Sequence, residues 1–189
     1  RYPLVGTVGR LEKRKGHVYF LQAACQVVKH LPDTVFLIAG DGPASRDLML
    51  QTHTLGIEKN VRFLGYRYDI EDVMAAMDVF VLTSLWEGLP RVLVQAAALG
   101  KPIVSFDSEG VREVVIDGDN GFVLPLRDVQ GLGERIIELM KDRPAAGRMG
   151  ERGRALVTAD WDVATMVQRI SDLYKHLLLR KGITFEPFS

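Results

Sequence analysis

Residues 85–102 read LWEGLPRVLVQAAALGKP, which is typical of a strand end, a glycine turn and a helix with defined ends. Pro90 fits the first helical turn, where its missing N–H costs no hydrogen bond, and Gly100 followed by a nearby proline marks the helix end. The unpaired N–H groups of the first turn then lie beside Glu87 and Gly88. Because these donors and the positive end of the helix dipole favour negative charge, the turn is a predicted anion site.

Glu87 and Gln95 stand eight residues apart in this stretch. At a helical rise, that separation corresponds to up to about 12 Å, which is close to the span of a sugar diphosphate. A carboxylate and an amide at its two ends could each hydrogen-bond hydroxyl groups, one set on a sugar and one on a ribose. This spacing gives the first hypothesis for what the turn binds.

The composition describes a well-packed chain without a strong overall charge. Of its 189 residues, 47% are hydrophobic and 25% are charged, which suffices for one buried domain with an appendage. Lys and Arg total 24 and Asp and Glu total 24, so no net field recruits nucleic acid or an anionic membrane. A single cysteine excludes an internal disulfide framework. With no signal peptide and no apolar run of bilayer length, we expect a cytoplasmic location.

Short apolar runs alternate with helical patterns, which is typical of consecutive βα units around a mostly parallel sheet. Six strands are predicted, at Leu4–Gly9, Val35–Gly40, Val61–Leu64, Val79–Thr83, Ile103–Phe106 and Gly121–Val123. Helices are predicted between and after them, at Gly16–His30, Ala44–Leu55, Ile70–Met77, Pro90–Leu99, Val111–Ile116 and Val129–Lys141. The predicted fold class is therefore α/β, a Rossmann-like three-layer α/β/α domain with a mostly parallel six-stranded sheet.

The pattern changes near residue 144 to two helical segments without a strand between them, Ala145–Thr158 and Asp162–Leu179. The last segment has a broad apolar face that must be buried. We therefore predict a nucleotide-sugar-binding domain at residues 1–159 and a C-terminal helix and tail at residues 160–189. Because the chain opens almost directly in a central-looking strand, we expect a fragment of a longer polypeptide.

Polar residues collect after the predicted strands, at the edge where an open parallel sheet binds its ligands. Arg10 and Lys15 follow the first strand, where two cations beside a helix start either bind a pyrophosphate or belong to a solvated loop. Gly40 and Gly42 follow the second strand and either let the backbone approach a ligand or form a tight turn. Residues 63–66 either place main-chain groups beside a planar base or form a plain core strand.

Several catalytic patterns are missing from the sequence. It contains no paired His and Cys spacing for zinc, no Walker loop, no nucleophile elbow and no triple-glycine dinucleotide fingerprint. An Asp-x-Asp at residues 117–119 is interpreted as a turn rather than a metal site. The histidines are scattered over helical patterns and are interpreted as surface or partly buried structural residues. The predicted site therefore depends on cations, backbone donors and Glu87.

Six segments in this order resemble the C-terminal domain of the retaining family-four (group 1) glycosyltransferases of the GT-B fold. They are Gly9-Arg10-Leu11 with Lys15-Gly16, Ala39-Gly40-Asp41-Gly42-Pro43, Val61-Arg62-Phe63-Leu64-Gly65, Ala76-Met77-Asp78-Val79-Phe80-Val81-Leu82-Thr83-Ser84, Glu87-Gly88-Leu89-Pro90, and Gly118-Asp119-Asn120-Gly121-Phe122-Val123-Leu124-Pro125. The resemblance covers essentially the whole chain, because the final helices resemble the segment that crosses back to the N-terminal domain in this family.

The resemblance implies the donor-binding half of an enzyme that transfers a sugar from a nucleotide-diphosphate sugar to an acceptor in glycan, glycolipid or polysaccharide biosynthesis. Arg10 and Lys15 match the cationic pair that binds the donor diphosphate and stabilises the leaving phosphate. Glu87 matches the first glutamate of the family's Glu-x7-Glu motif, which contacts the donor sugar. Gln95 occupies the second glutamate position, which usually holds the ribose hydroxyls, and its amide lacks the charge-assisted strength of a carboxylate. The implied catalytic residues are Arg10, Lys15 and Glu87.

The other implied donor contacts come from the same segments and are Gly9, Gly40, Gly42, Arg62, Leu64, Gly88, Leu89, Pro90, Val92 and Gln95. The implied donor is a UDP- or GDP-linked sugar, with no metal and no other cofactor. The implied partners are this nucleotide sugar and an N-terminal acceptor-binding domain outside these residues; peripheral membrane association of the full enzyme is left open. The competing interpretation is a non-catalytic nucleotide-sugar-binding module that acts through a partner subunit.

Overall fold

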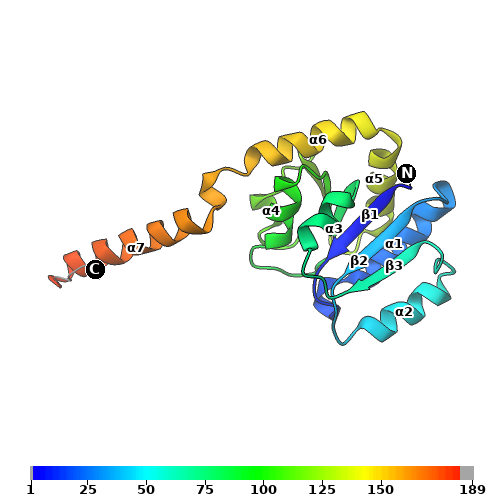
Figure 1. The fold of residues 1–189 in the computed structure, drawn as a ribbon, viewed down its shortest axis with the longest axis horizontal. Coiled ribbons are helices and arrows are strands. Elements are labelled where there is room, and N and C mark those ends of the chain that lie inside the picture. The colour runs from blue at the N-terminus through cyan, green and yellow to red at the C-terminus, as the bar shows by residue number, and fades with distance from the viewer. Residues whose placement is uncertain (1, 184–189) are drawn as a thin grey trace. The chain divides into compact units, whose positions relative to one another are not determined.

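The computed structural model describes residues 2–183, and the chain divides into two compact units, Arg1–Leu156 and Val157–Ser189. The first unit contains β1 (Leu4–Val8), β2 (Val35–Ala39), β3 (Val61–Gly65), β4 (Val79–Leu82), β5 (Ile103–Phe106) and β6 (Gly121–Leu124). They form a six-stranded sheet in the order β3-β2-β1-β4-β5-β6, in which all neighbours are parallel. The strands β1, β2 and β3 are labelled side by side in Figure 1. The predicted α/β class and the six strands are confirmed.

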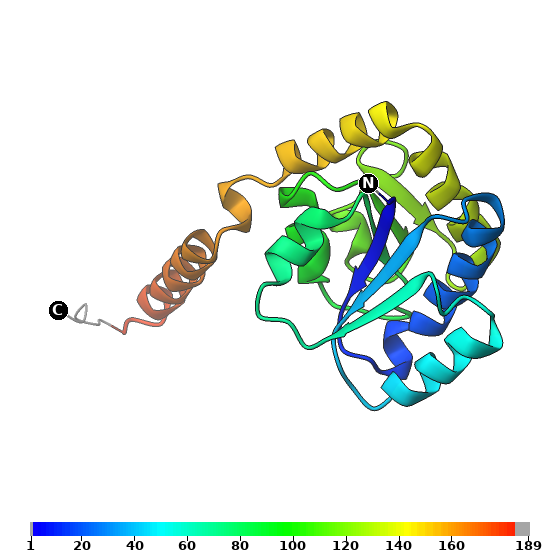
Figure 2. The ribbon, with the colours of Figure 1, turned by 45° about the vertical axis from the view of Figure 1, so that its right-hand side comes forward.

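Helices cover both faces of this sheet, as Figure 2 shows. On one face, α1 (His17–His30) packs against α2 (Ser45–Thr54) and α5 (Val129–Lys141). On the other, α3 (Ile70–Ala76) contacts α4 (Arg91–Ala98), and α6 (Arg143–Leu156) runs along α4. This division follows from right-handed crossovers, because the strand order advances in opposite directions on the two sides of β1. The three-layer arrangement is therefore confirmed.

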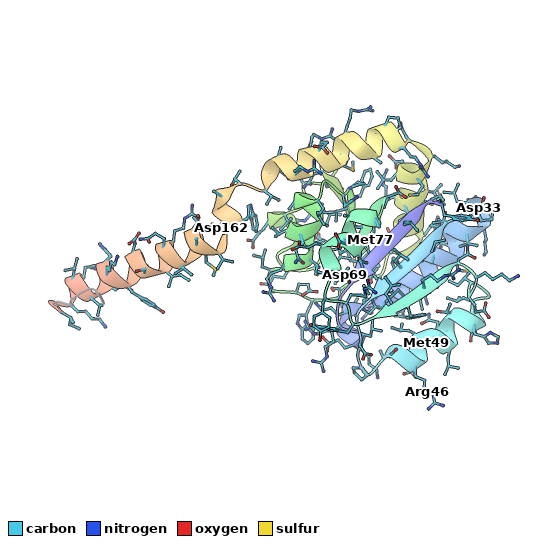
Figure 3. All side chains as sticks on the ribbon, viewed as in Figure 1. Asp33, Arg46, Met49, Asp69, Met77 and Asp162 are labelled. Carbon is cyan, nitrogen blue, oxygen red and sulfur yellow. The ribbon has the colours of Figure 1, made fainter. Side chains whose placement is uncertain are left out.

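The central strands are apolar on both sides, because helices cover both faces of a parallel sheet. Every residue of β4 and β5 is buried. Phe36 of β2 and Phe20 of α1 are fully buried, and their rings meet edge to face at 5.6 Å between centroids. Met77, labelled in Figure 3, fills the space over Gly6 of β1. The core thus supports the loops at the carboxyl ends of the strands.

The predicted helix at Val111–Ile116 is wrong. The structure has a single 3-10 turn there, η2 (Val111–Glu113). The buried Asn120 side chain takes the backbone groups that a helix would need: Ile116 N donates to Asn120 Oδ1 at 2.7 Å, and Asn120 Nδ2 donates to Val114 O at 2.9 Å. A side chain from the following turn therefore ends the helix before it completes a second turn.

Five helices also begin one or two residues away from their predicted starts, and prolines are involved in two of these cases. Pro90 lies just before α4 with φ −74° and ψ 93°, so the helix begins at Arg91 rather than at the proline. Conversely, α6 begins at Arg143, two residues before the predicted start, and Pro144 occupies its first turn. Proline is tolerated there because the first helical N–H groups have no partner within the helix.

The second unit contains η3 (Ala159–Trp161) and α7 (Val163–Arg180). The predicted terminal helix is confirmed, and none of its residues is buried. The residues of its predicted apolar face are between 42% and 68% exposed and comprise Val163, Met166, Val167, Ile170, Leu173, Tyr174 and Leu177. Across residues 2–183, no helix combines the length and apolar character needed to cross a membrane. The last part of the predicted tail, residues 184–189, lies outside the described residues.

Candidate functional site

The order in which strands are added to the sheet changes direction at β1. β2 and β3 lie on one side of this strand, and β4, β5 and β6 lie on the other. In open α/β sheets, ligands bind outside the carboxyl ends of the strands at such a switch point. The loops after β1, β2 and β4 meet at this place, and they carry Arg10, Gly40 and Glu87.

The loops after β1 and β2 pack backbone to backbone. Gly9 N donates to Ala39 O at 3.0 Å, and Leu11 N donates to Asp41 O at 2.9 Å. Gly40 has φ 141°, and a Cβ there would lie 1.9 Å from the carbonyl oxygen of Gly9. Glycine is therefore required at position 40 for close contact with the neighbouring loop, which neither of the two sequence interpretations had included.

A cavity of about 540 Å³ opens where these loops meet the loop after β3. Its lining combines glycine backbone with polar and aromatic groups from Gly9, Arg10, Gly40, Asp41, Gly42, Tyr66 and Arg67, among others. The Arg10 side chain is 70% exposed, and its Nε lies 3.9 Å from Glu12 Oε2. This guanidinium is thus available to a ligand in the cavity.

Arg67 was not among the predicted site residues, and Tyr66 was considered only for its main chain, within residues 63–66. Tyr66 is 70% exposed and meets the ring of Tyr68 edge to face, with centroids 5.0 Å apart. Arg67 Nε donates to Asp69 Oδ1 at 2.7 Å, and this bonding lowers the pKa of the Asp69 carboxyl. The available signal was their position directly after the third strand, at the end of the segment considered for a planar base.

Lys15 and Glu87 form an ion pair across the loops after β1 and β4. Lys15 Nζ lies 2.5 Å from Glu87 Oε1, and the two side chains are 16% and 8% exposed. Lys15 ends the 3-10 turn η1 (Lys13–Lys15), whereas Glu87 precedes α4. Two of the three predicted catalytic residues are therefore brought into direct contact.

The backbone behind this pair is held by three contacts. Leu85 N donates to Arg14 O at 2.8 Å, and Thr83 Oγ1 donates to Lys15 O at 3.2 Å. Gly16 has φ 64°, and a Cβ there would lie 2.1 Å from Thr83 O. The two loops consequently form one unit, and the positions of the cation and the carboxylate are coupled.

His17 contacts the backbone of the loop after β1, which carries Arg10 and Lys15. The residue is 4% exposed, and its Nε2 lies 3.2 Å from the carbonyl oxygen of Arg10. Burial lowers the pKa of His17 to about 4, against the opposing effect of the Arg10 carbonyl, and the Lys15 cation lowers it further. The imidazole is therefore neutral at pH 7, and Nε2 can donate to Arg10. The sequence indicated a structural histidine but not this contact, for which its place directly after Gly16 was the available signal.

The start of α4 is open. Gly88 is exposed, and no atom lies within 4 Å of the position that a Cβ would take. Leu89 is 44% exposed, Pro90 is buried, and no side chain caps the first turn. The loop after β5 closes one side, since a Cβ on Gly110 would lie 1.9 Å from Gly88 O. Backbone donors at this helix start thus lie beside the Lys15–Glu87 pair.

The remaining predicted residues lie at different depths. Val92 and Gln95 are half-buried on α4, and Leu64 is half-buried in β3. Arg62 is not brought toward the cations, because its Nη1 donates to Lys59 O at 2.9 Å and to Val61 O at 3.0 Å. These carbonyls lie at the amino end of β3, whereas the candidate site lies at the carboxyl ends.

The Asp-x-Asp at residues 117–119 has structural contacts. Asp117 Oδ1 accepts from Val123 N at 2.9 Å, and Asp119 Oδ1 lies 2.6 Å from Arg152 Nε. Within residues 2–183, no group of three or more His, Cys, Asp or Glu side chains could hold a metal ion.

Comparison with known proteins gives one family. Residues 1–156 match the model described as Glycosyl transferases group 1. The UDP-Gal:alpha-D-GlcNAc-diphosphoundecaprenol alpha-1,3-galactosyltransferase of Escherichia coli is 32% identical over 92% of this chain and 46% of its own length. The lipopolysaccharide core biosynthesis glycosyltransferase LpsE of Rhizobium meliloti is 32% identical over 95% of this chain and 50% of its own. The chain thus spans about half the length of these relatives.

Solved structures agree with this match. Anabaena HepE in complex with UDP-glucose is 30% identical, with a TM-score of 0.87 over 93% of this chain and 49% of that one. S. aureus TarM shares the fold at 21% identity, with a TM-score of 0.85 over 92% of this chain and 36% of that one. From the family match and these folds, the chain belongs to the group 1 glycosyltransferases and corresponds to the C-terminal domain of their GT-B architecture.

Proposed function

We propose that this chain is the donor-binding half of a retaining glycosyltransferase that takes its sugar from a nucleotide-diphosphate sugar. The observation that carries the proposal is the Lys15–Glu87 pair, in which Lys15 shares the loop after β1 with the exposed Arg10 and Glu87 precedes the uncapped start of α4. Cations and backbone N–H groups suit a diphosphate, and a carboxylate accepts hydrogen bonds from sugar hydroxyls. The chemistry of a sugar diphosphate is therefore matched by adjacent groups.

The proposed mechanism follows from where charge develops. Breaking the bond between the anomeric carbon and the phosphate leaves negative charge on the diphosphate and positive charge on the sugar. Arg10, Lys15 and the first-turn N–H groups of α4 stabilise the departing diphosphate, while Glu87 holds the sugar. Because the Lys15–Glu87 pair and the backbone of α4 are held in place before the reaction, their part of this stabilisation costs little reorganisation.

The nucleotide end of the donor is proposed to lie in the 540 Å³ cavity beside Gly9 and Gly40. Exposed Tyr66 offers an aromatic ring there, and glycine backbone allows a planar base to approach closely. HepE, the structural relative at 30% identity, was solved with UDP-glucose, which favours a UDP-linked donor over a GDP-linked one. A mannosyltransferase of Corynebacterium glutamicum that is named as GDP-mannose-dependent is 33% identical to this chain. A GDP-linked donor is therefore tested alongside the UDP-linked one.

The acceptor is proposed to bind to an N-terminal half outside this chain. The support is that the chain spans about half of its relatives and that α7 exposes apolar residues along its length. That helix is proposed to cross back and pack on the N-terminal half. A cytoplasmic location and a role in glycan, glycolipid or polysaccharide synthesis belong to the same proposal.

The test is calorimetric titration of the chain with UDP, GDP, UDP-glucose and GDP-mannose in the presence of a chelator. We expect binding without divalent metal, and replacement of Arg10 and Lys15 by alanine should weaken it at least about tenfold, since charged hydrogen bonds contribute about 1.5–3 kcal/mol each. Lys13→Ala is the matched control, because it removes an exposed charge from the same turn. Equal affinity in the double variant and the parent would refute this site.

A further inference from the structure

The two cations of the proposed diphosphate site are in different electrostatic situations. Arg10 is 70% exposed, and its Nε lies 3.9 Å from Glu12 Oε2. Lys15 is 16% exposed and is already neutralised by Glu87 at 2.5 Å. An anion that reaches Lys15 therefore meets the negative charge of Glu87 at the same place.

Glu87 is held at this place by the loops on which the pair is built. Leu85 N donates a hydrogen bond to Arg14 O, and Thr83 Oγ1 donates one to Lys15 O. The Glu87 side chain is itself 8% exposed, so a bound ligand replaces little water around it. In so buried a setting, charges interact more strongly than they do in water.

The donor and the product of sugar transfer differ in charge at this position. In a nucleotide sugar the terminal phosphate is esterified to the sugar and carries one negative charge. In the free nucleoside diphosphate it is a terminal phosphate with about 1.5 to 2 negative charges near pH 7, because its second pKa is about 6. The sugar hydroxyls of the donor can also donate to Glu87, and the free diphosphate lacks them.

We propose that the Lys15–Glu87 pair discriminates between nucleotide sugar and nucleoside diphosphate, with Glu87 as the residue that weakens binding of the product. Glu87 repels the additional charge of the free diphosphate, and it compensates for this repulsion in the donor by accepting hydrogen bonds from sugar hydroxyls. The pair thereby favours binding of the donor and release of the product. This inference rests on the function proposed above.

The test compares Glu87→Gln with the parent chain by calorimetry, using UDP against UDP-glucose, GDP against GDP-mannose, and inorganic pyrophosphate. Removing the charge should tighten the free diphosphates about tenfold, as expected for loss of one close like charge. The nucleotide sugars should gain nothing or weaken, so the ratio of the two affinities moves toward the product. Glu109→Gln, which removes an exposed carboxylate from the adjacent loop after β5, controls for the change in net charge.

Two further variants keep the result decisive. Adding Lys15→Gln to Glu87→Gln should abolish the tightening, because the effect is assigned to the pair. Glu87→Asp retains the charge but shortens the side chain, so it should shift the ratio in the same direction by less; it decides the case if circular dichroism shows that Glu87→Gln is unfolded.

The outcomes separate this inference from the proposed function. If the parent binds none of the nucleotides, the proposed function fails and the discrimination fails with it. If the parent binds them and the ratio stays unchanged in both Glu87 variants, or changes equally in Glu109→Gln, the discrimination is refuted while the donor site stands.

Discussion

At the scale of single residues, the site is made by contacts between distant parts of the chain. Lys15 and Glu87 are separated by 72 positions in sequence, yet their charged atoms lie 2.5 Å apart. The eight-residue spacing of Glu87 and Gln95 suggested instead that both act along one helix. Glu87 precedes α4, and Gln95 lies within it. The ribose contact of Gln95 stays a prediction, whereas the partner of Glu87 is given by the fold.

His17 should make stability depend on pH. Its pKa is about 4 in the folded chain and near its ordinary 6.5 when unfolded, so the unfolded state binds more protons between these values. The stabilisation is therefore fully present above about pH 6.5 and is lost as the pH falls toward 4, by about 3 kcal/mol at 1.36 kcal/mol per pKa unit. Urea unfolding at pH 7 and pH 4.5 measures this loss.

His17→Gln removes the titrating group but keeps a donor for the Arg10 carbonyl. We expect the variant to lose clearly less stability than the parent between the two pH values. His30→Gln, at an exposed histidine, should behave like the parent. Identical pH dependence in the parent and in His17→Gln would show that the buried imidazole does not control it.

Sequence motifs could indicate which residues lie near the site, but not where every side chain points. Arg10, Lys15 and Glu87 follow strands, and the parallel sheet brings such positions to one edge. Arg62 lies inside a strand, and its long side chain reaches back to the carbonyl of Lys59. The contact of His17 with the Arg10 carbonyl was missed because full burial and a backbone partner cannot be inferred from an isolated histidine in a helical pattern.

At the scale of elements, the strands were predictable because each is a short apolar run between turn residues. The helix predicted at Val111–Ile116 was not, because the competing bonds come from Asn120 beyond its end. The start of α4 was misplaced by a single residue, since Pro90 can stand either before a helix or in its first turn. The local sequence pattern therefore predicted which elements form, whereas contacts from outside an element decided where it begins or ends.

The far end of α4 is fixed by α6. Arg154 Nη2 donates to Leu99 O at 3.2 Å, which complements the negative end of the α4 dipole. A Cβ on Gly150 would lie 2.0 Å from Gly100 O, so the two backbones touch. Because α4 begins at the candidate site, this contact supports the site from its opposite end.

Two glycines of α6 should therefore respond in opposite ways to alanine. Gly150→Ala forces the backbones apart and should destabilise the chain by about 1–3 kcal/mol, as overpacking does. Gly147 has no atom within 4 Å of its Cβ position, so Gly147→Ala should stabilise the same helix by about 0.5–1 kcal/mol. Chemical denaturation measures both changes, and equal effects of the two variants would contradict the close contact at position 150.

At the scale of the whole molecule, the chain carries one half of the proposed reaction. Its first unit contains the groups proposed to bind the donor, and α7 of its second unit has no buried residue. Apolar faces of this kind gain about 25 cal/mol for each Å² removed from water, which makes a packing partner favourable. The relatives that the chain matches are about twice its length, which is consistent with a second half that supplies both that partner and the acceptor site.

The chain alone should therefore bind its donor but transfer no sugar to an acceptor. Replacing Ile170 and Leu173 by serine should leave its nucleotide affinity unchanged, because these side chains are 44% and 55% exposed and belong to the second unit. The same replacements in a chain extended by the N-terminal half should lower transfer, since the packing of α7 would be lost. Mass spectrometry of donor, product and released sugar separates transfer from donor hydrolysis. Robust transfer by the purified chain alone would refute the need for a second half, and unchanged transfer in the extended variant would refute the role of α7.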